Sequence, residues 1–269
     1  MTLTAPRFAE LHAPANWRTV DFISDLHLQL SEPLTVQAWE RYLAQTRADA
    51  LFILGDLFEV WVGDDGLQAL DEDARFERHC VDVLKAVSAR CAVHFMHGNR
   101  DFLLGSACAS AAGFVLLDDP TVLVFGDQRW LLTHGDALCL DDTDYLQFRA
   151  QVRQPAWQQA FLAKPLAERR AIARGLRQQS EDRKLSGLAY ADVDAPLARH
   201  WLKSAAASQL IHGHTHKPAD HDLGAGLHRC VLSDWDAAAR APRTEVLRLQ
   251  RPDSAGTIQV RRLPASEIA

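Results

Sequence analysis

Five short apolar segments recur along the chain, and polar side chains follow directly after each one. The segments cover residues 20–24, 51–54, 92–96, 130–133 and 210–211. Short apolar runs bounded by polar residues predict buried β-strands. In α/β sheets, the loops after the carboxyl ends of the strands converge on one crevice. The pattern therefore predicts that polar residues from five loops meet at one edge of a sheet.

Helical patterns lie between these strands. Apolar residues recur at spacings of three and four in residues 34–46 and 76–89, which is typical of amphipathic helices. Alternating strands and helices predict a layered α/β domain. Residues 145–202 break the alternation with long helical patterns, and we interpret them as a helical insertion or cap. Short strands are expected again in 230–235, 244–249 and 257–263.

The expected organisation is one catalytic domain over residues 18–250, with the helical insertion at about 145–202 inside it. Residues 1–17 are expected to form an N-terminal extension, and residues 251–269 a C-terminal strand and tail. A chain of 269 residues, 48% of them apolar, can bury one sizeable core. The five cysteines are never paired as CxxC, so buried free thiols are expected rather than a disulfide framework.

The sequence also predicts a compartment. No run approaches the ~20 apolar residues that a membrane-spanning helix requires, and the first 17 residues lack the apolar centre of a signal peptide. We therefore expect a cytoplasmic protein. The net charge of -6 argues against non-specific binding to nucleic acid, because such binding usually needs excess Lys and Arg.

Charge is distributed unevenly along the chain. Residues 146–184 contain nine basic and three acidic side chains, which gives this segment +6 and leaves -12 for the rest. The same segment carries an apolar helical face, formed by Trp157, Phe161, Leu162, Leu166, Ile172 and Leu176. A basic amphipathic helix suits an anionic membrane surface, and its apolar face could grip acyl chains. The alternative is an ordinary helix that packs this face on the domain.

Seven polar residues after the predicted strands form a candidate metal-binding set. They are Asp25, His27, Asp56, Asn99, His134, His214 and His216. Imidazole, carboxylate and amide donors without a thiolate suit Mn²⁺, Fe²⁺ or Zn²⁺. Two cations ~3.5–4 Å apart need a shared anion between them, and Asp56 is the bridging candidate. Any one of these residues could instead cap a helix or lie in the core, so the prediction depends on the ordered set.

Three further histidines are close to these motifs but are not assigned as ligands. His212 lies two residues before His214, and His94 and His97 lie in or beside the predicted strand 92–96. We interpret His212 as a strand-end residue or a group that supports ligands, and His94 and His97 as core residues or groups that support ligands.

The order Asp-x-His, Gly-Asp, Gly-Asn, His and Gly-His-x-His resembles the calcineurin-like metallophosphoesterase superfamily over roughly residues 20–240. The resemblance implies an α/β fold with a two-sheet β sandwich flanked by helices. It further implies two metal sites that share one carboxylate. Asp25, His27, Asp56 and His216 would hold the first ion, and Asp56, Asn99, His134 and His214 the second.

Arg100 departs from the superfamily pattern. Many of these phosphoesterases have Gly-Asn-His where this chain has Gly98-Asn99-Arg100-Asp101. An arginine stays protonated near neutral pH and cannot act as a general acid, but its planar fork matches phosphate oxygens. We therefore predict that Arg100 clamps charge in the transition state, with Asn99 beside it. A good leaving group, such as a phosphate ester displaced from a pyrophosphate, tolerates the loss of a general acid.

Longer strings make a narrower resemblance. Residues 53–65, 97–105, 134–142 and 211–218 are similar to the UDP-2,3-diacylglucosamine hydrolase family. This resemblance implies hydrolysis of the substrate pyrophosphate to UMP and 2,3-diacylglucosamine 1-phosphate (lipid X) in lipid A biosynthesis. It implies two Mn²⁺ per chain, with Fe²⁺ or Zn²⁺ left open, and a hydroxide shared by the two ions as nucleophile. It also implies peripheral association with the cytoplasmic face of the inner membrane.

The family's substrate-binding positions fall on residues from three parts of the chain. They are Asn99, Arg100, Asp142, Ser180, Lys184 and His214. Lys184 is only the nearest candidate for a lysine that the family places near the end of the insertion. No nucleic acid and no obligate protein partner are expected. Two alternatives stay open, namely a related phosphoesterase acting on nucleotides or phosphoproteins and a metal-free scaffold that binds a partner. Arg100 argues against the first, and the seven ligand types against the second.

Overall fold

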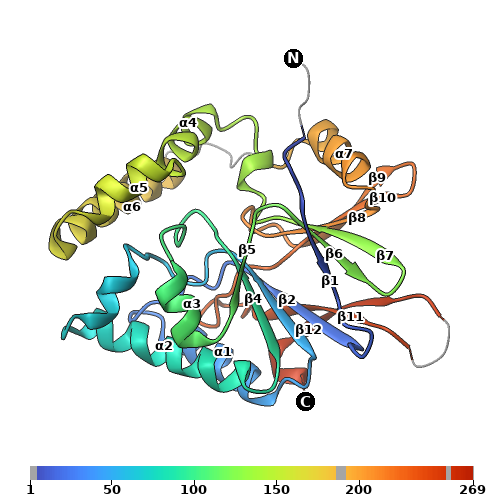
Figure 1. Ribbon diagram of the computed structural model, residues 1–269, viewed down its shortest axis with the longest axis horizontal. Helices are drawn as coiled ribbons and strands as arrows, with labels where there is room; N and C mark the ends of the chain where they lie inside the picture. The colour runs from blue at the N-terminus through green and yellow to red at the C-terminus, as the bar shows by residue number, and fades with distance from the viewer. Residues whose placement is uncertain (1–4, 186–191, 253–255, 269) are drawn as a thin grey trace.

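The computed structural model describes residues 5–185, 192–252 and 256–268, except for the side chains of residues 179–185. Its strands form two six-stranded sheets (Figure 1). In spatial order, the first sheet contains β1 (Ala9–His12), β6 (Thr121–Phe125), β7 (Gln128–Leu132), β8 (Gln209–His212), β10 (Leu227–Val231) and β9 (Ala219–Gly224). The second contains β12 (Gln259–Pro264), β11 (Glu245–Gln250), β2 (Thr19–Ile23), β3 (Ala50–Leu54), β4 (Ala92–Met96) and β5 (Val115–Leu117).

The two sheets pack face to face through large apolar side chains. Phe22, Phe52, Phe125 and Trp130 all lie in the core between them. Helices α1 (Pro33–Gln45), α2 (Glu72–Ser88) and α3 (Ser106–Ala112) pack a second core against the outer face of the β2–β5 sheet. Helix α7 (Ala195–Ser204) packs a third core against the other sheet. The predicted two-sheet β sandwich flanked by helices is confirmed.

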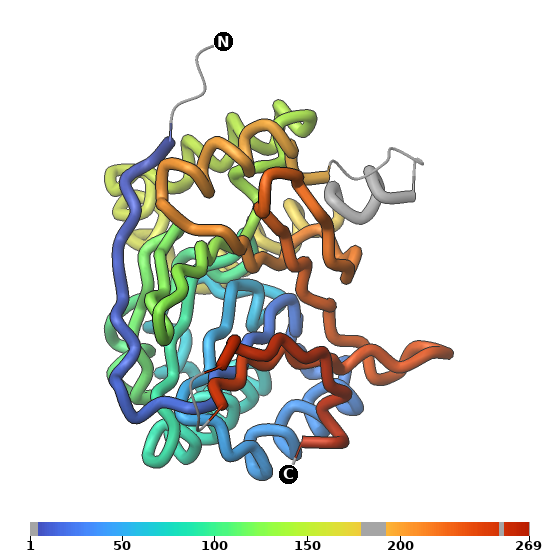
Figure 2. The backbone as a smooth tube through the Cα atoms, turned by 90° about the vertical axis from the view of Figure 1, so that its right-hand side faces the viewer, coloured from blue at the N-terminus to red at the C-terminus, as the bar shows by residue number. Residues whose placement is uncertain are grey.

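The five predicted strands correspond to β2, β3, β4, β7 and β8. Every residue of β3 is buried, which explains its uninterrupted apolar sequence, because both faces of this sheet are covered. The N-terminal segment runs along the outside of the sandwich in Figure 2. Within it β1 pairs in parallel with β6, so part of the predicted extension belongs to the first sheet. The described residues also form three short 3₁₀ helices, η1 (Asp64–Gln68), η2 (Asp136–Leu138) and η3 (Ala265–Glu267).

The helical insertion divides into two parts. Helices α4 (Thr143–Val152), α5 (Pro155–Leu162) and α6 (Leu166–Leu185) lie together at one end of the sandwich (Figure 1). Helix α7, which the sequence places at the end of the same insertion, instead packs on the first sheet through Leu197, Trp201 and Leu202. The insertion that overhangs the sandwich therefore consists of α4, α5 and α6.

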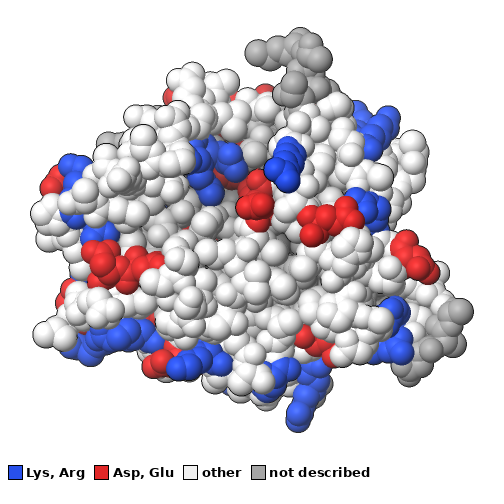
Figure 3. Space-filling model, in the orientation of Figure 1, with Lys and Arg blue, Asp and Glu red and all other residues white. Residues whose placement is uncertain are grey.

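Basic side chains hold this insertion on the sandwich. Arg169 is only 1% exposed, donates to the carbonyl of Val62 at 2.5 Å and pairs with Asp65. Arg153 donates to the carbonyl of Gly98 at 2.8 Å. On the face drawn in Figure 3, acidic and basic side chains lie next to each other at the hollow below the insertion. Many basic side chains of residues 146–184 therefore form contacts inside the molecule.

The apolar face of the insertion is mostly covered as well. Four of its six predicted members pack against the helix-side core, namely Trp157, Phe161, Leu166 and Ile172. Leu162 and Leu176 remain exposed, at 41% each. Packing on the domain thus accounts for most of this face. In the described part of the chain, no helix combines the length and apolarity needed to cross a bilayer. All five cysteines are buried with free thiols, as predicted.

His94 is a core residue, which is one of the two roles predicted for it from the sequence. Its ring stacks on Phe52 with centroids 4.7 Å apart and meets the edge of Trp17 at 6.0 Å. Neither ring nitrogen has a hydrogen-bond partner among the described residues. Burial lowers the pKa of His94 to about 4, so the folded protein keeps this ring neutral in mildly acidic solution.

We predict that His94 makes the protein less stable in acid. The unfolded chain binds a proton at this histidine near pH 6.5, whereas the folded protein binds it only near pH 4. The neutral ring therefore costs no stability above pH 6.5. As the pH falls toward 4, protonation of the unfolded chain lowers the free energy of unfolding by on the order of 1–3 kcal/mol. Urea unfolding at several pH values measures it. His94→Phe keeps the stacking and should flatten this part of the curve; an unchanged slope would contradict the assignment.

Candidate metal centre

The seven predicted ligands come together at one edge of the sandwich. Asp25 and His27 follow β2, Asp56 follows β3, Asn99 follows β4, His134 follows β7, and His214 and His216 follow β8. Five of them line a cavity of about 570 Å³, namely His27, Asp56, Asn99, His214 and His216. The other two, Asp25 and His134, are fully buried. The convergence predicted from the strand endings is therefore present.

The backbone is unusual at these positions. Five of the seven residues have a positive φ, with values of 52° for Asp25, 49° for His27, 54° for Asp56, 66° for His214 and 53° for His216. The left-handed region is unfavourable for residues with a Cβ and costs on the order of 1–3 kcal/mol per residue. Such strain persists only where the surrounding structure enforces it. Its concentration here supports a functional role for this edge.

Two glycines next to the ligands allow the loops to approach closely. A Cβ atom on Gly98 would lie 2.0 Å from Oδ1 of Asp56, and one on Gly213 would lie 2.3 Å from Oδ2 of Asp25. Real Cβ contacts are not this short, so only glycine fits at either position. The Gly-Asn and Gly-His motifs of the sequence therefore place backbone directly against a buried carboxylate.

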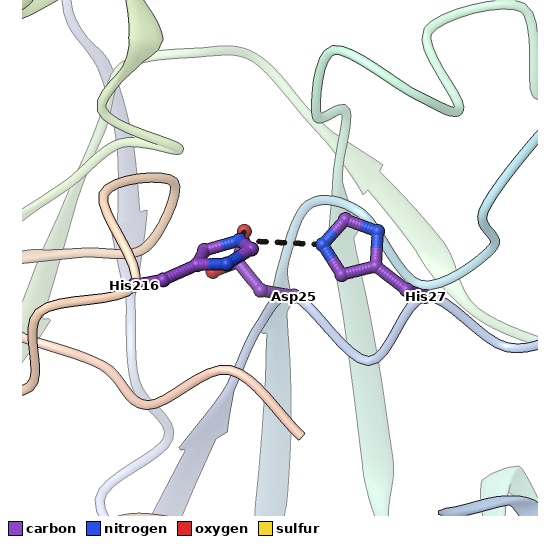
Figure 4. A group of neighbouring side chains, drawn as sticks. All are labelled: Asp25, His27 and His216. Atoms are coloured by element: carbon purple, nitrogen blue, oxygen red, sulfur yellow. Dashed lines mark hydrogen bonds and ion pairs between the residues drawn. The ribbon is translucent and has the colours of Figure 1, made fainter. Parts of the chain in front are cut away.

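The first group of ligands contains Asp25, His27 and His216 (Figure 4). Nε2 of His27 and Nε2 of His216 face each other at 3.3 Å, and Nε2 of His216 lies 3.3 Å from Oδ1 of Asp25. Two imidazole nitrogens and one carboxylate oxygen thus point at the same small volume. The arrangement fits a divalent cation, because nitrogen and oxygen donors converge without a thiolate.

The second group contains Asp56, Asn99, His134 and His214. Oδ1 of Asn99 lies 3.1 Å from Nε2 of His134 and 3.0 Å from Nδ1 of His214. Nε2 of His134 also lies 3.7 Å from Oδ2 of Asp56. The other nitrogen of His134 contacts the carbonyl of Leu54 at 2.9 Å, which directs Nε2 into the site. These four donors suit the same metals as the first group.

The two ligand groups lie next to each other, and their charged side chains interact. A carboxylate oxygen of Asp25 lies within 4.8 Å of donor atoms of Asp56 and His134, so the first group continues into the second. Burial disfavours the charged form of Asp25, but His216, His134 and His27 hold its pKa well below the usual range. Burial likewise disfavours charged His134, yet Asp56 and Asp25 raise its pKa to about 9. The carboxylates therefore attract positive charge to this edge, and a bound cation would displace protons.

Asp101 is a supporting residue whose role was not predicted from the sequence. Its buried carboxylate accepts hydrogen bonds from the backbone N–H groups of Leu57 at 2.7 Å and Gly98 at 2.8 Å. Burial and the nearby Asp56 raise the pKa of Asp101 to about 7. Asp101 thus joins the loop after β3 to the loop after β4. Its place directly after Gly-Asn-Arg was the only signal available in the sequence.

Tyr145 of α4 is a second residue that the sequence did not reveal. Its ring stacks on His214, with centroids 5.9 Å apart, and its hydroxyl donates to Asp136 at 2.5 Å. Arg149 of the same helix donates to Asp136 through Nε at 2.8 Å. The insertion therefore contributes directly to the surroundings of a predicted metal ligand. Nothing in the spacing of Tyr145 pointed to this contact.

The predicted substrate-binding residues fall into two sets. Arg100 and Asp142 line the cavity together with Asn99 and His214. Asp142 also caps α4 by accepting a hydrogen bond from the backbone N–H of Tyr145 at 3.1 Å. Ser180 and Lys184 lie on the last turns of α6, and their side chains are outside the described residues.

The three unassigned histidines lie outside the ligand groups. His212 is fully buried, contacts the carbonyl of Gly213 through Nδ1 at 2.8 Å and has a pKa lowered by burial to about 3. His97 contacts the carbonyl of Leu104 at 2.7 Å through Nε2, and His94 lies in the core between the sheets. None of the three belongs to a metal-ligand group among the described residues.

Comparison with known proteins identifies the family. The sequence model of the calcineurin-like phosphoesterases matches residues 18–218. A UDP-2,3-diacylglucosamine hydrolase from Chromobacterium violaceum is 47% identical over 220 residues, which cover 80% of this chain and 90% of that protein. Proteins of the same name from Chromohalobacter salexigens and Cellvibrio japonicus are 42% and 44% identical, over 81% and 80% of this chain and 89% and 90% of their own lengths. The chain therefore belongs to the calcineurin-like phosphoesterase family, and within it to the UDP-2,3-diacylglucosamine hydrolases.

Proposed function

We propose that this protein hydrolyses the pyrophosphate of UDP-2,3-diacylglucosamine and releases UMP and 2,3-diacylglucosamine 1-phosphate. The names of its relatives at 42–47% identity support the substrate. The observation that carries the proposal is Arg100, which lines the cavity beside the predicted metal ligands. A guanidinium next to two divalent cations suits a substrate with two linked phosphates, because both charged groups can be bound at once.

The backbone and side chain of Arg100 are both held in place. Its backbone N–H donates to Oδ1 of Asp56 at 2.9 Å, and its carbonyl accepts from the N–H of Trp61 at 3.1 Å. Its Nη1 lies 3.7 Å from a carboxylate oxygen of Glu59. The buried Nε has no hydrogen-bond partner among the described residues. The guanidinium group lines the cavity, and its 3.7 Å separation from Glu59 is longer than a hydrogen bond, which fits a clamp on the developing charge.

The proposed metal assignment follows the two ligand groups. Asp25, His27 and His216 would hold one ion, Asn99, His134 and His214 the other, and Asp56 would be shared. Mn²⁺ is the proposed metal, and the donor set also suits Fe²⁺ and Zn²⁺. When bound, the two ions would supply Lewis acidity and make a water-derived nucleophile available near neutral pH. Arg100 would then offset charge as the bond between phosphorus and the bridging oxygen breaks.

Association with the cytoplasmic face of the membrane is a further part of the proposal. It is supported by Leu162 of α5 and Leu176 of α6, which are each 41% exposed on the insertion. A Leu162→Glu, Leu176→Glu double variant should bind vesicles of anionic phospholipid roughly tenfold more weakly, because apolar burial is lost. Cosedimentation measures the binding. Equal binding by the variant and the unaltered protein would contradict a membrane contact through these helices.

Removal of the proposed shared ligand should be the most damaging single change at the site. Asp56→Ala should bind fewer than two Mn²⁺ per chain and lose turnover, because two cations would then face each other without the anion between them. Elemental analysis after desalting gives the metal content. His212→Ala serves as the control and should keep two ions. An Asp56→Ala protein with two ions and near-normal rate would refute the shared role.

The proposed substrate can be tested directly with the unaltered protein. The unaltered protein with Mn²⁺ should convert UDP-2,3-diacylglucosamine to UMP and the lipid monophosphate, as seen by mass analysis. Turnover of nucleotide or phosphoprotein substrates alone would contradict the proposal.

Arg100→Ala should keep both ions and lose roughly 10²–10³-fold in kcat. Arg100→Lys should also be slower, since the fork is lost, and Arg100→His should not restore activity. Near-normal turnover in Arg100→Ala would make the residue structural.

A further inference from the structure

Glu59 lies between a predicted metal ligand and two arginines. It follows β3 and lines the cavity with a side chain that is only 11% exposed. One carboxylate oxygen, Oε2, lies 2.9 Å from Nδ1 of His27. The other, Oε1, lies 3.1 Å from Nε of Arg177 and 3.7 Å from Nη1 of Arg100. A single carboxylate thus contacts three groups that come from three different loops or helices.

The contact with His27 determines which ring nitrogen is free. A neutral imidazole carries one N–H, and a carboxylate beside Nδ1 favours the form that is protonated there. Nε2 is then left with its lone pair, and this atom faces Nε2 of His216 at 3.3 Å. The 2.9 Å separation at Nδ1 is a hydrogen-bonding distance, although the N–H is not aligned with the oxygen.

The contact with the two arginines controls charge on the cavity wall. Arg100 and Arg177 both line the cavity, and Arg177 is part of α6. Nη1 of Arg177 also donates to the side-chain oxygen of Gln29 at 3.0 Å. Two guanidinium groups this close repel each other unless an anion lies between them. Glu59 supplies that anion, so it allows both cations to face the same part of the cavity.

We propose that Glu59 is a positioning residue that orients His27 toward a bound metal ion and holds Arg100 on the cavity wall. Metal affinity and the geometry of phosphate binding then depend on the same side chain. The inference about Arg100 rests on the proposed hydrolysis of a pyrophosphate. The inference about His27 does not, because it concerns metal binding alone. The two parts can therefore fail independently.

The metal part is tested without substrate. Isothermal titration of the metal-free protein with Mn²⁺ should show one of the two sites weakened roughly 10- to 100-fold in Glu59→Ala and less in Glu59→Gln, because a carboxylate that supports a ligating histidine contributes on this scale. The other site should be unchanged. Two unaltered sites in both variants would overturn the proposal.

Arg177→Gln is the matched control. It removes the contact between Glu59 and α6 but leaves the carboxylate beside His27, so both Mn²⁺ affinities should stay within about twofold. An equal loss of affinity in Arg177→Gln and Glu59→Gln would mean that docking of α6, and not orientation of His27, controls the metal site. That result would also overturn the proposal.

Kinetics and spectroscopy separate positioning from a general loss of structure. Glu59→Gln should regain part of its rate in excess Mn²⁺ while its KM stays raised, because displacement of Arg100 persists when the metal site is refilled. A misfolded variant would not respond to added metal.

Proton NMR of the unaltered, Zn²⁺-loaded protein needs no variant. The Nδ1–H proton of His27 should be shifted downfield and protected from exchange, and rapid exchange would contradict the contact with Glu59.

Discussion

Asp25 and Asp56 are two carboxylates buried near each other at the edge of the sandwich, and much of the structure around them offsets their charge. Asp25 is fully buried and Asp56 is 2% exposed. Burying like charges together is unfavourable unless positive groups or hydrogen-bond donors are close by. Backbone N–H groups of His214 and Arg100 donate to these carboxylates, and imidazoles surround them. The left-handed loops and the glycines beside them bring these donors near enough.

The same requirement explains how the insertion is attached. Its buried or half-buried arginines contact carbonyl and carboxylate oxygens of the sandwich, as Arg169 does at Val62 and Asp65. Tyr145 and Arg149 reach Asp136, which lies two residues after a predicted ligand. Charge in the insertion therefore contributes to assembling the cavity.

Sequence patterns predicted the central strands and the convergence of polar residues after them, because both are local. A fully buried strand is apolar, and the polar residues follow its carboxyl end directly in the sequence. The strand β6 (Thr121–Phe125) is equally apolar, but it was not predicted because no ligand motif follows it. The edge strand β9 (Ala219–Gly224) has a polar sequence, since half of its residues are exposed. Contacts such as Tyr145 on His214 depend on how α4 folds over the sandwich, which no local pattern encodes.

The left-handed conformations of the ligand residues also bear on how such a protein could change over time. Each of these residues holds the chain in a state that costs free energy, on the order of 1–3 kcal/mol. Glycine at Asp25, His27 or Asp56 would relax the backbone. Loss of either buried carboxylate would, however, leave the N–H groups of His214 and Arg100 without their acceptors. A chain that carries the full set therefore holds strain in these loops that glycine at the same positions would relieve.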